Sequence, residues 1–221
     1  MPDVPGYSVA KNGFRFANDF PNVPMQVVIW GHPLSFFTAG NGLCGGITFL
    51  GRDYFEAALP VPEVIQAPSS GTLFQALCAR QLASFDIPAG FLRYLDWMCP
   101  ARPWRDFGTI QGRWERTVHE EWPRVKADID SGHPSPLGLI HTLSWSPCDI
   151  GKNHQVLAWG YDIDGCHLTL KVCDPNHPGN AGICLKVDLA GGSPIAWNGS
   201  RDSVHGFFRS QYRAALPPGK A

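Results

Sequence analysis

The chain has 221 residues, of which 44% are hydrophobic, and its formal net charge is −1. That length and apolar content allow one large domain with a buried core, and they argue against disorder over most of the chain. The near-neutral charge, without a basic block, gives no electrostatic reason to expect nucleic acid as a partner. No apolar run approaches the ~18 residues of a membrane span, and residues 1–6 lack the pattern of a signal peptide. We therefore expect no membrane span and favour a cytoplasmic location.

The first half of the chain has the periodicity of helices. Residues 1–24 are expected to wrap the surface, residues 26–30 to form a short strand, and residues 31–43 to form a loop. Apolar side chains then recur at helical spacing over 45–59, until Pro60 and Pro62 end the helix. Further helices are predicted over 72–85, 89–98 and about 114–129. Pro123 must begin a helix or kink one within the last of these.

The second half has the alternation and turn residues of β-strands. This order, helices and then strands, predicts an α+β fold. We interpret residues 1–221 as a single domain with a helical lobe over about 25–131 and a β-rich lobe over 132–213, followed by a loose tail over 214–221. The expected strands cover residues 137–143, 155–161, 167–173, 183–187 and 204–212.

Cysteine usage points away from a metal site. No CxxC pair occurs, and the Cys and His spacing shows no zinc pattern, so we expect neither a metal nor a cofactor. An odd count would suit one catalytic thiol and three disulfides in an exported protein, but the absence of a signal peptide favours reduced thiols. The seven positions are Cys44, Cys78, Cys99, Cys148, Cys166, Cys173 and Cys184.

Cys44 stands out because it lies between glycine-containing segments at the predicted start of a helix, in Asn41-Gly42-Leu43-Cys44-Gly45-Gly46. Unsatisfied backbone N–H groups and the helix dipole favour negative charge at such a position, which is where a thiol is most readily held as a thiolate. Cys44 is therefore a candidate nucleophile. The alternative is a buried structural thiol at a tight turn.

A predicted hairpin supplies partners for that thiol. A three-residue loop of Ile163, Asp164 and Gly165 would close the pair Asp162–Cys166. This register sets Tyr161 opposite His167, Val156 opposite Val172 and His154 opposite Asp174. Directly opposed side chains are close enough for an imidazole–carboxylate hydrogen bond. A two-residue Asp164–Gly165 turn would instead place His154 opposite Pro175. The face that carries His154, Val156, Ala158, Leu168, Leu170, Val172 and Asp174 is expected to face the core, with its polar end at the rim.

Cys44, His154 and Asp174 follow the order of a nucleophile, a general base and the carboxylate that orients the base. In this order and context the chain resembles the papain-like cysteine peptidase superfamily, and its Asp174-Pro175 form is closer to bacterial bacteriocin-processing members than to papain itself. The resemblance implies a helical lobe whose nucleophile helix packs on a C-terminal antiparallel sheet or barrel. It covers roughly residues 43–175 and implies a peptide, protein or other amide substrate.

The chain departs from the family pattern on both sides of the cysteine. The family often has a Gln about half a dozen residues before the nucleophile, whereas here no Gln occurs between Gln26 and Cys44. Asn41 is the nearest side-chain amide and is our candidate oxyanion donor, together with the backbone N–H of Cys44. Gly45 replaces the usual aromatic residue and would suit close approach of a substrate to the backbone.

The expected activity is that of a cysteine-dependent hydrolase, a peptidase or amidase, that works through a thioester acyl-enzyme. A transglutaminase- or deamidase-like acyl transfer uses the same order of residues, and a catalytically silent binding domain could share the scaffold. The individual residues also have alternative roles. His154 could donate a hydrogen bond to a backbone carbonyl, and Asp174 could simply cap a turn. Asn176 is a rival partner for His154. A metal site of His154, Asp174 and His177 is not favoured by any regular spacing.

Overall fold

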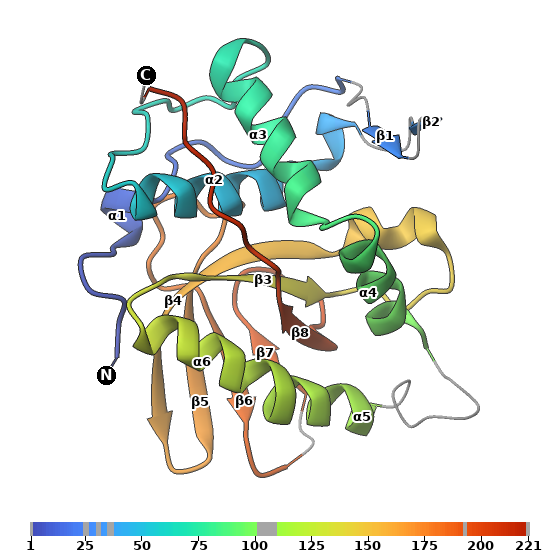
Figure 1. Cartoon of the computed structure of the whole chain (residues 1–221). Coiled ribbons are helices and arrows are strands. Elements are labelled where there is room, and N and C mark those ends of the chain that lie inside the picture. Colours follow the sequence, from blue (N-terminus) through green and yellow to red (C-terminus); the bar gives the residue numbers. More distant parts are fainter. Residues whose placement is uncertain are drawn as a thin grey trace.

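The structure is a computed structural model that describes residues 2–23, 27–29, 32–34, 38–100, 110–191 and 194–219. Helices occupy most of the first half of the chain and an antiparallel sheet occupies the second half (Figure 1). The α+β class predicted from the sequence is confirmed. Within these described ranges, no helix is both long enough and apolar enough to cross a membrane.

The apolar spacing predicts the helices of the first half well. α4 has the expected bounds, and α3 is displaced by one residue. α2 begins one residue early and ends at Glu56, three residues before the predicted end, so Pro60 and Pro62 do not end it. Ala58, with a φ of +54°, already lies outside the helical conformation. The short elements at the start differ from expectation, since two paired strands stand where we expected one strand and a loop; Gln26 and Trp30, the ends of the expected strand, lie outside the described residues. The elements are α1 (Val9–Asn12), β1 (Val27–Ile29), β2 (His32–Leu34), the 3₁₀ helix η1 (Ala39–Asn41), α2 (Cys44–Glu56), α3 (Gly71–Ser84) and α4 (Ala89–Met98).

The last helical run shows how the chain accommodates Pro123. α5 (Ile110–Glu115), the π-helical turn η3 (Arg116–Glu121) and α6 (Trp122–Asp130) follow one another without a break. A proline lacks an N–H group and its ring clashes with the carbonyl four residues earlier, so a regular α-helix cannot continue through it undisturbed. The wider π turn directly before Pro123 relieves that conflict.

The second half forms one six-stranded sheet in which all neighbours are antiparallel. Its strand order is β7-β6-β5-β4-β3-β8. β5 has the predicted bounds, and β4 extends beyond the predicted strand at both ends. The other expected strands are shifted or shortened by a few residues, and the short strand β7 was not predicted. The elements are β3 (Ser135–Ile140), the 3₁₀ helix η4 (Pro147–Lys152), β4 (His154–Asp164), β5 (His167–Cys173), β6 (Cys184–Asp188), β7 (Ala196–Trp197) and β8 (Gly206–Arg209).

The β4–β5 hairpin has a different register from the one that we predicted. Its turn contains two residues, Gly165 and Cys166, and the closing pair is Asp164–His167 rather than Asp162–Cys166. Gly165 has a φ of +57°, the sign that a type II′ turn requires at its first central residue. The pairs predicted for Tyr161 and Val156 are therefore wrong, since Tyr161 pairs with Leu170, and Val172 pairs with Ala158.

A β-bulge at Trp159 shifts the register once more, between Ala158 and Gly160. The N-terminal segment pairs at this point: the Val4 N–H donates to the Trp159 carbonyl at 2.8 Å, and Asp3 forms a bridge with Gly160. A Cβ atom on Gly160 would lie 2.2 Å from Asp3 Oδ1, so a larger residue there would displace the Asp3 side chain. Past the bulge, Leu157 pairs with Cys173, and Asp174 follows this last pair of the two strands.

The predicted core face of the hairpin is confirmed despite the wrong register. Val156, Ala158, Leu168, Leu170 and Val172 are each 0% exposed, and His154 and Asp174 are buried at the end of the same face. The two-residue turn shifts the pairing by an odd number of residues, which alone would turn His154 and Asp174 to opposite faces. The extra residue at the bulge, Trp159, returns the two ends of the strands to one face. Gln155, the residue after His154 on β4, is also buried.

α2 joins the helical half to the sheet. It packs against α3 on one side and against β4 on the other (Figure 1). The Thr48 hydroxyl lies 3.4 Å from the Gln155 carbonyl, so the helix crosses β4 next to His154. This packing brings the first turn of α2 to the end of β4 at which His154 lies.

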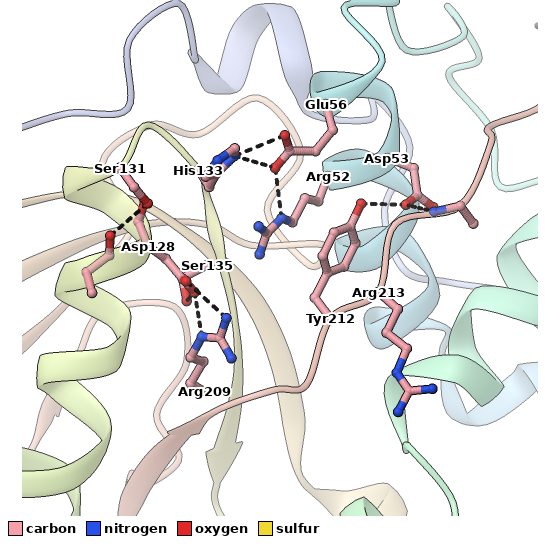
Figure 2. A network of polar contacts seen from close by, with 12 residues as sticks. Arg52, Asp53, Glu56, Asp128, Ser131, His133, Ser135, Arg209, Tyr212 and Arg213 are labelled. Atoms are coloured by element: carbon pink, nitrogen blue, oxygen red, sulfur yellow. Dashed lines mark hydrogen bonds and ion pairs between the residues drawn. The ribbon is translucent and has the colours of Figure 1, made fainter.

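The C-terminal segment corrects another expectation, because residues 214–219 are not a loose tail. From Tyr212 onward the chain crosses α2 (Figure 1), and Figure 2 shows Tyr212 directed at Asp53. Asp53 Oδ1 accepts hydrogen bonds from the Tyr212 hydroxyl at 2.6 Å and from the Ala215 N–H at 3.0 Å. The Tyr54 hydroxyl donates to the Pro218 carbonyl at 3.0 Å.

Candidate active site

Cys44 is the first residue of α2, as the sequence predicts. Gly42, two residues earlier, has a φ of +88°, and a Cβ atom there would lie 2.5 Å from Asn18 Nδ2. Glycine is therefore required at position 42 both by the backbone conformation and by the closeness of Asn18. The turn delivers Cys44 to the helix N-terminus with its side chain partly exposed.

Two long-range hydrogen bonds fix the start of α2. Asn18 Oδ1 accepts from the Leu43 N–H at 2.6 Å, and Gln81 Oε1, on α3, accepts from the Gly46 N–H at 2.8 Å. The amides of Cys44 and Gly45 lie between these two capped positions. The first turn of a helix has N–H groups without intrahelical partners, so side-chain acceptors of this kind stabilise it.

Position 45 requires glycine for a packing reason that the sequence did not reveal. A Cβ atom at this position would lie 2.2 Å from Ser84 Oγ and 2.7 Å from Gln155 Nε2. Those two side chains are hydrogen-bonded to each other at 3.0 Å. The space beside Gly45 is therefore filled by α3 and β4, rather than left for a substrate as we had expected.

His154 and Asp174 are in direct contact. His154 Nε2 lies 2.6 Å from Asp174 Oδ1, and both side chains are almost fully buried. The contact that we predicted therefore forms, although the register that we used to predict it is wrong. Continuing the pairing past the bulge sets Asp174 opposite Val156, and His154 is then its diagonal neighbour on the same face, within reach of long side chains.

The Asp174 carboxylate is held by two further contacts. Its Oδ1 accepts from the Asn176 N–H at 2.9 Å, and its Oδ2 lies 2.7 Å from His177 Nδ1. Asp174 thus caps a turn and contacts His154 at the same time, so the two alternatives for this residue are compatible. Asn176, the rival partner, instead accepts a hydrogen bond from Asn18 at 3.1 Å.

These contacts set the charges of the pair. Burial tends to lower the pKa of His154, but hydrogen bonds with Asp174 and Cys44, and the charges of those two groups, raise it to about 10. Burial tends to raise the pKa of Asp174, whereas its contacts with His154, the Asn176 N–H and His177 lower it overall. An imidazolium and a carboxylate are therefore favoured at neutral pH.

Cys44 completes the group. Asp174 occupies Nε2 of His154, which leaves Nδ1 for another partner, and Cys44 lies close enough to His154 to raise the pKa of its imidazole. The structure therefore brings Cys44, His154 and Asp174 together in the predicted order of contacts. A sulfur next to an imidazolium, whose other nitrogen is held by a carboxylate, is chemically suited to nucleophilic attack followed by proton return.

A second histidine flanks the group. The rings of His141 and His154 have centroids 6.4 Å apart. His141 Nδ1 donates to the Ser203 carbonyl at 2.9 Å. Burial, and the nearby charge of His154, lower the pKa of His141, against a raising effect of the Ser203 carbonyl. A neutral His141 therefore lies beside a charged His154. His141 belongs to the surroundings of the group rather than to its chain of contacts.

The oxyanion assignment stays a prediction. Asn41 is the last residue of η1 and is exposed, three residues before the thiol. Sequence reasoning missed Asn18 and Gln81, whose side chains cap the start of α2. No local pattern marks them, since Asn18 lies in a loop and Gln81 reads as an ordinary polar residue of α3.

All seven cysteines lie in described parts of the chain and are free thiols. Comparisons of the chain with protein-family models, with curated proteins and with solved structures gave no match. The fold and the site therefore define an α+β protein with a grouped thiol, imidazole and carboxylate. The function has to be argued from that chemistry.

Proposed function

We propose that this protein is a cysteine-dependent hydrolase of amide bonds, a peptidase or amidase. The observation that supports it is the chain of contacts from the Cys44 thiol to His154 and from His154 to Asp174 at 2.6 Å. Nucleophilic hydrolases use this set of groups in this arrangement. The papain-like resemblance is part of the proposal, and the packing of α2 against an antiparallel sheet supports it.

The proposed reaction proceeds by acyl transfer. The Cys44 thiolate attacks the substrate carbonyl, and the resulting oxyanion accepts hydrogen bonds from the Cys44 N–H and from Asn41. His154 then gives its proton to the leaving amine, and a thioester remains on Cys44. His154 next takes a proton from water, whose oxygen attacks the thioester and releases the acid and the thiol. Asp174 holds the ring and stabilises its charged form throughout.

The first test is the rate at which iodoacetamide alkylates each cysteine at pH 6, with the sites located by mass spectrometry. Cys148 is exposed and Cys44 only partly exposed, so accessibility alone would make Cys148 the faster of the two. If His154 holds a thiolate on Cys44, Cys44 should react about 10-fold faster or more, because the thiolate is the reactive form. The advantage should disappear in His154→Gln.

Cys44 reacting no faster than Cys148 would overturn the proposal. If Cys44 is activated, a peptide-library digestion with and without an added primary amine separates hydrolysis from transfer. A free carboxylate product supports the hydrolase, whereas incorporation of the amine would indicate acyl transfer. Activated Cys44 without any turnover of amides would indicate a binding domain.

A further inference from the structure

A second group of reactive side chains lies at the far end of β4. Cys166 and His167 follow Gly165 at the β4–β5 turn, and Asp188 is the last residue of β6. One ligand atom from each of the three residues lies within 4.8 Å of the other two. His154 is at the opposite end of the eleven-residue β4, so the two groups are separated by roughly 30 Å of strand.

The sheet holds these residues in place through their backbones. His167 pairs with Asp164 across the turn and with Asp188 on β6. The Leu189 N–H donates to the Cys166 carbonyl at 2.8 Å, and Trp114 Nε1 donates to the Asp188 carbonyl at 2.8 Å. Unlike a chance group of surface side chains, the three backbones are fixed relative to one another.

The side chains are also oriented toward one another. Cys166 Sγ lies 3.9 Å from His167 Nε2. The Ala190 N–H donates to Asp188 Oδ1 at 2.9 Å. The Asp188 carboxylate therefore lies beside the thiol and the imidazole, within 4.8 Å of the ligand atom of each.

We propose that Cys166, His167 and Asp188 bind a Zn²⁺ ion. Sulfur, imidazole nitrogen and carboxylate oxygen are the three ligand types of protein zinc sites. Tetrahedral zinc, with bonds of about 2.3 Å to sulfur and 2.0 Å to nitrogen, holds those two atoms roughly 3.5 Å apart. The observed 3.9 Å is close to that value. Binding converts the Cys166 thiol into a zinc thiolate and releases its proton to solvent, and water supplies the fourth ligand.

The site would join the β4–β5 turn to the end of β6, so a bound ion should stabilise the sheet. No sequence motif marks this group, because Asp188 lies more than twenty residues from Cys166 and the Cys-His dipeptide has no spacing typical of a zinc motif. The proposal does not depend on the hydrolase function, since the three residues lie at the opposite end of β4 from His154.

The test is titration of the full-length protein with Co²⁺, whose bond to a thiolate produces a charge-transfer absorption band, followed by displacement with Zn²⁺. Cys44 and His154 also form a thiol–imidazole pair, so Cys44→Ser must be compared with Cys166→Ser. Cys184→Ser, at a half-buried thiol on β6, is the matched control. Melting curves of each variant without metal report on its folding.

The expected result is a band in the wild type, Cys44→Ser and Cys184→Ser proteins, its loss in Cys166→Ser, and Zn²⁺ affinity weakened roughly 100-fold or more in Asp188→Asn. Zn²⁺ should raise the melting temperature of the wild type and not of Cys166→Ser. Absence of the band from the wild type, or a band lost in Cys44→Ser and kept in Cys166→Ser, would overturn the proposal.

Discussion

A group of buried charged side chains lies at each end of helix α2, and the two groups differ in whether one member is accessible to solvent. At the C-terminal half of α2, the Asp53 carboxylate is 1% exposed and contacts Arg80, Tyr212 and the Ala215 N–H. At the N-terminal end, His154 and Asp174 are similarly buried, but Cys44 is partly exposed. The Asp53 carboxylate is thus surrounded by partners from the protein, whereas the group at the N-terminal end includes a partly exposed sulfur.

The two groups differ in what surrounds each charge. Burial raises the pKa of Asp53, and hydrogen bonds from Tyr212, Ala215 and Arg80 oppose that effect. These partners belong to the fold and compensate for the buried charge. At the N-terminal end, the corresponding interactions favour a charged His154 imidazole next to the partly exposed sulfur of Cys44. Substitutions at the two ends should therefore change different properties.

The largest expected effect is on activity at the N-terminal end. Cys44→Ala removes the nucleophile and should reduce turnover of an amide substrate on the order of 10⁴-fold or more. The fold should be largely unaffected, since the change removes one partly exposed sulfur. Turnover and thermal unfolding of the same preparation check both points. Retention of activity in Cys44→Ala would contradict the proposed mechanism.

The next effect is on stability at the other end. Asp53→Ala leaves the Arg80 guanidinium buried without its carboxylate and should lower the free energy of unfolding by about 3–5 kcal/mol. Glu63→Ala is the control, because Glu63 pairs with Arg15 while 79% exposed, and should change little. Urea unfolding measures both. The alkylation rate of Cys44 in folded Asp53→Ala should stay at the wild-type value; a large fall would show that the two ends are coupled.

A smaller effect is expected from Asp174→Asn. The Asp174 carboxylate is the main group that raises the pKa of His154 to about 10, so the variant should lose the His154 proton at a lower pH. NMR titration of the histidine rings measures this, with His154→Gln identifying the resonance. Turnover should fall roughly 10²-fold because the imidazole is no longer held as its charged form. An unchanged His154 titration would contradict the assigned contact.

The smallest effect is expected at Asn18, which links the start of α2 to the turn after β5. Asn18→Ala removes the acceptor for the Leu43 N–H and the donor to Asn176, at a cost of about 1 kcal/mol in unfolding free energy. Misplacement of Cys44 should also reduce its alkylation rate by a few-fold. Asn18→Asp keeps the acceptor for Leu43 and should recover most of both losses. Equal effects of the two substitutions would indicate that this hydrogen bond is unimportant.

The fold class and most helices could be predicted because they depend on local periodicity. The apolar stripe over Ala89–Met98 and the alternation over His167–Cys173 fixed those elements to the residue. The meeting of His154 with Asp174 was predicted correctly, but from a wrong register. The two-residue turn alone would set the two side chains on opposite faces, and the bulge at Trp159 returns them to one face.

The register itself could not be predicted, because its cause lies elsewhere in the chain. The bulge at Trp159 coincides with pairing by Asp3 and Val4, more than 150 residues earlier. The caps of α2 were missed for the same reason, since Asn18 and Gln81 act across 25 and 35 residues. Nothing in the hairpin or helix sequence encodes such a contact.

The crossing of α2 by the C-terminal segment has a consequence for synthesis of the protein on the ribosome. Asp53 bonds with Ala215 across 162 residues, and Arg80 donates to the Arg213 carbonyl across 133. Until residues 212–215 emerge, the nascent chain holds a carboxylate and a guanidinium whose remaining partners have not been translated. Such long-range contacts form slowly, so α2 reaches its final environment only after residues 212–215 have been translated, and Cys44 at its other end is fixed in place late with it.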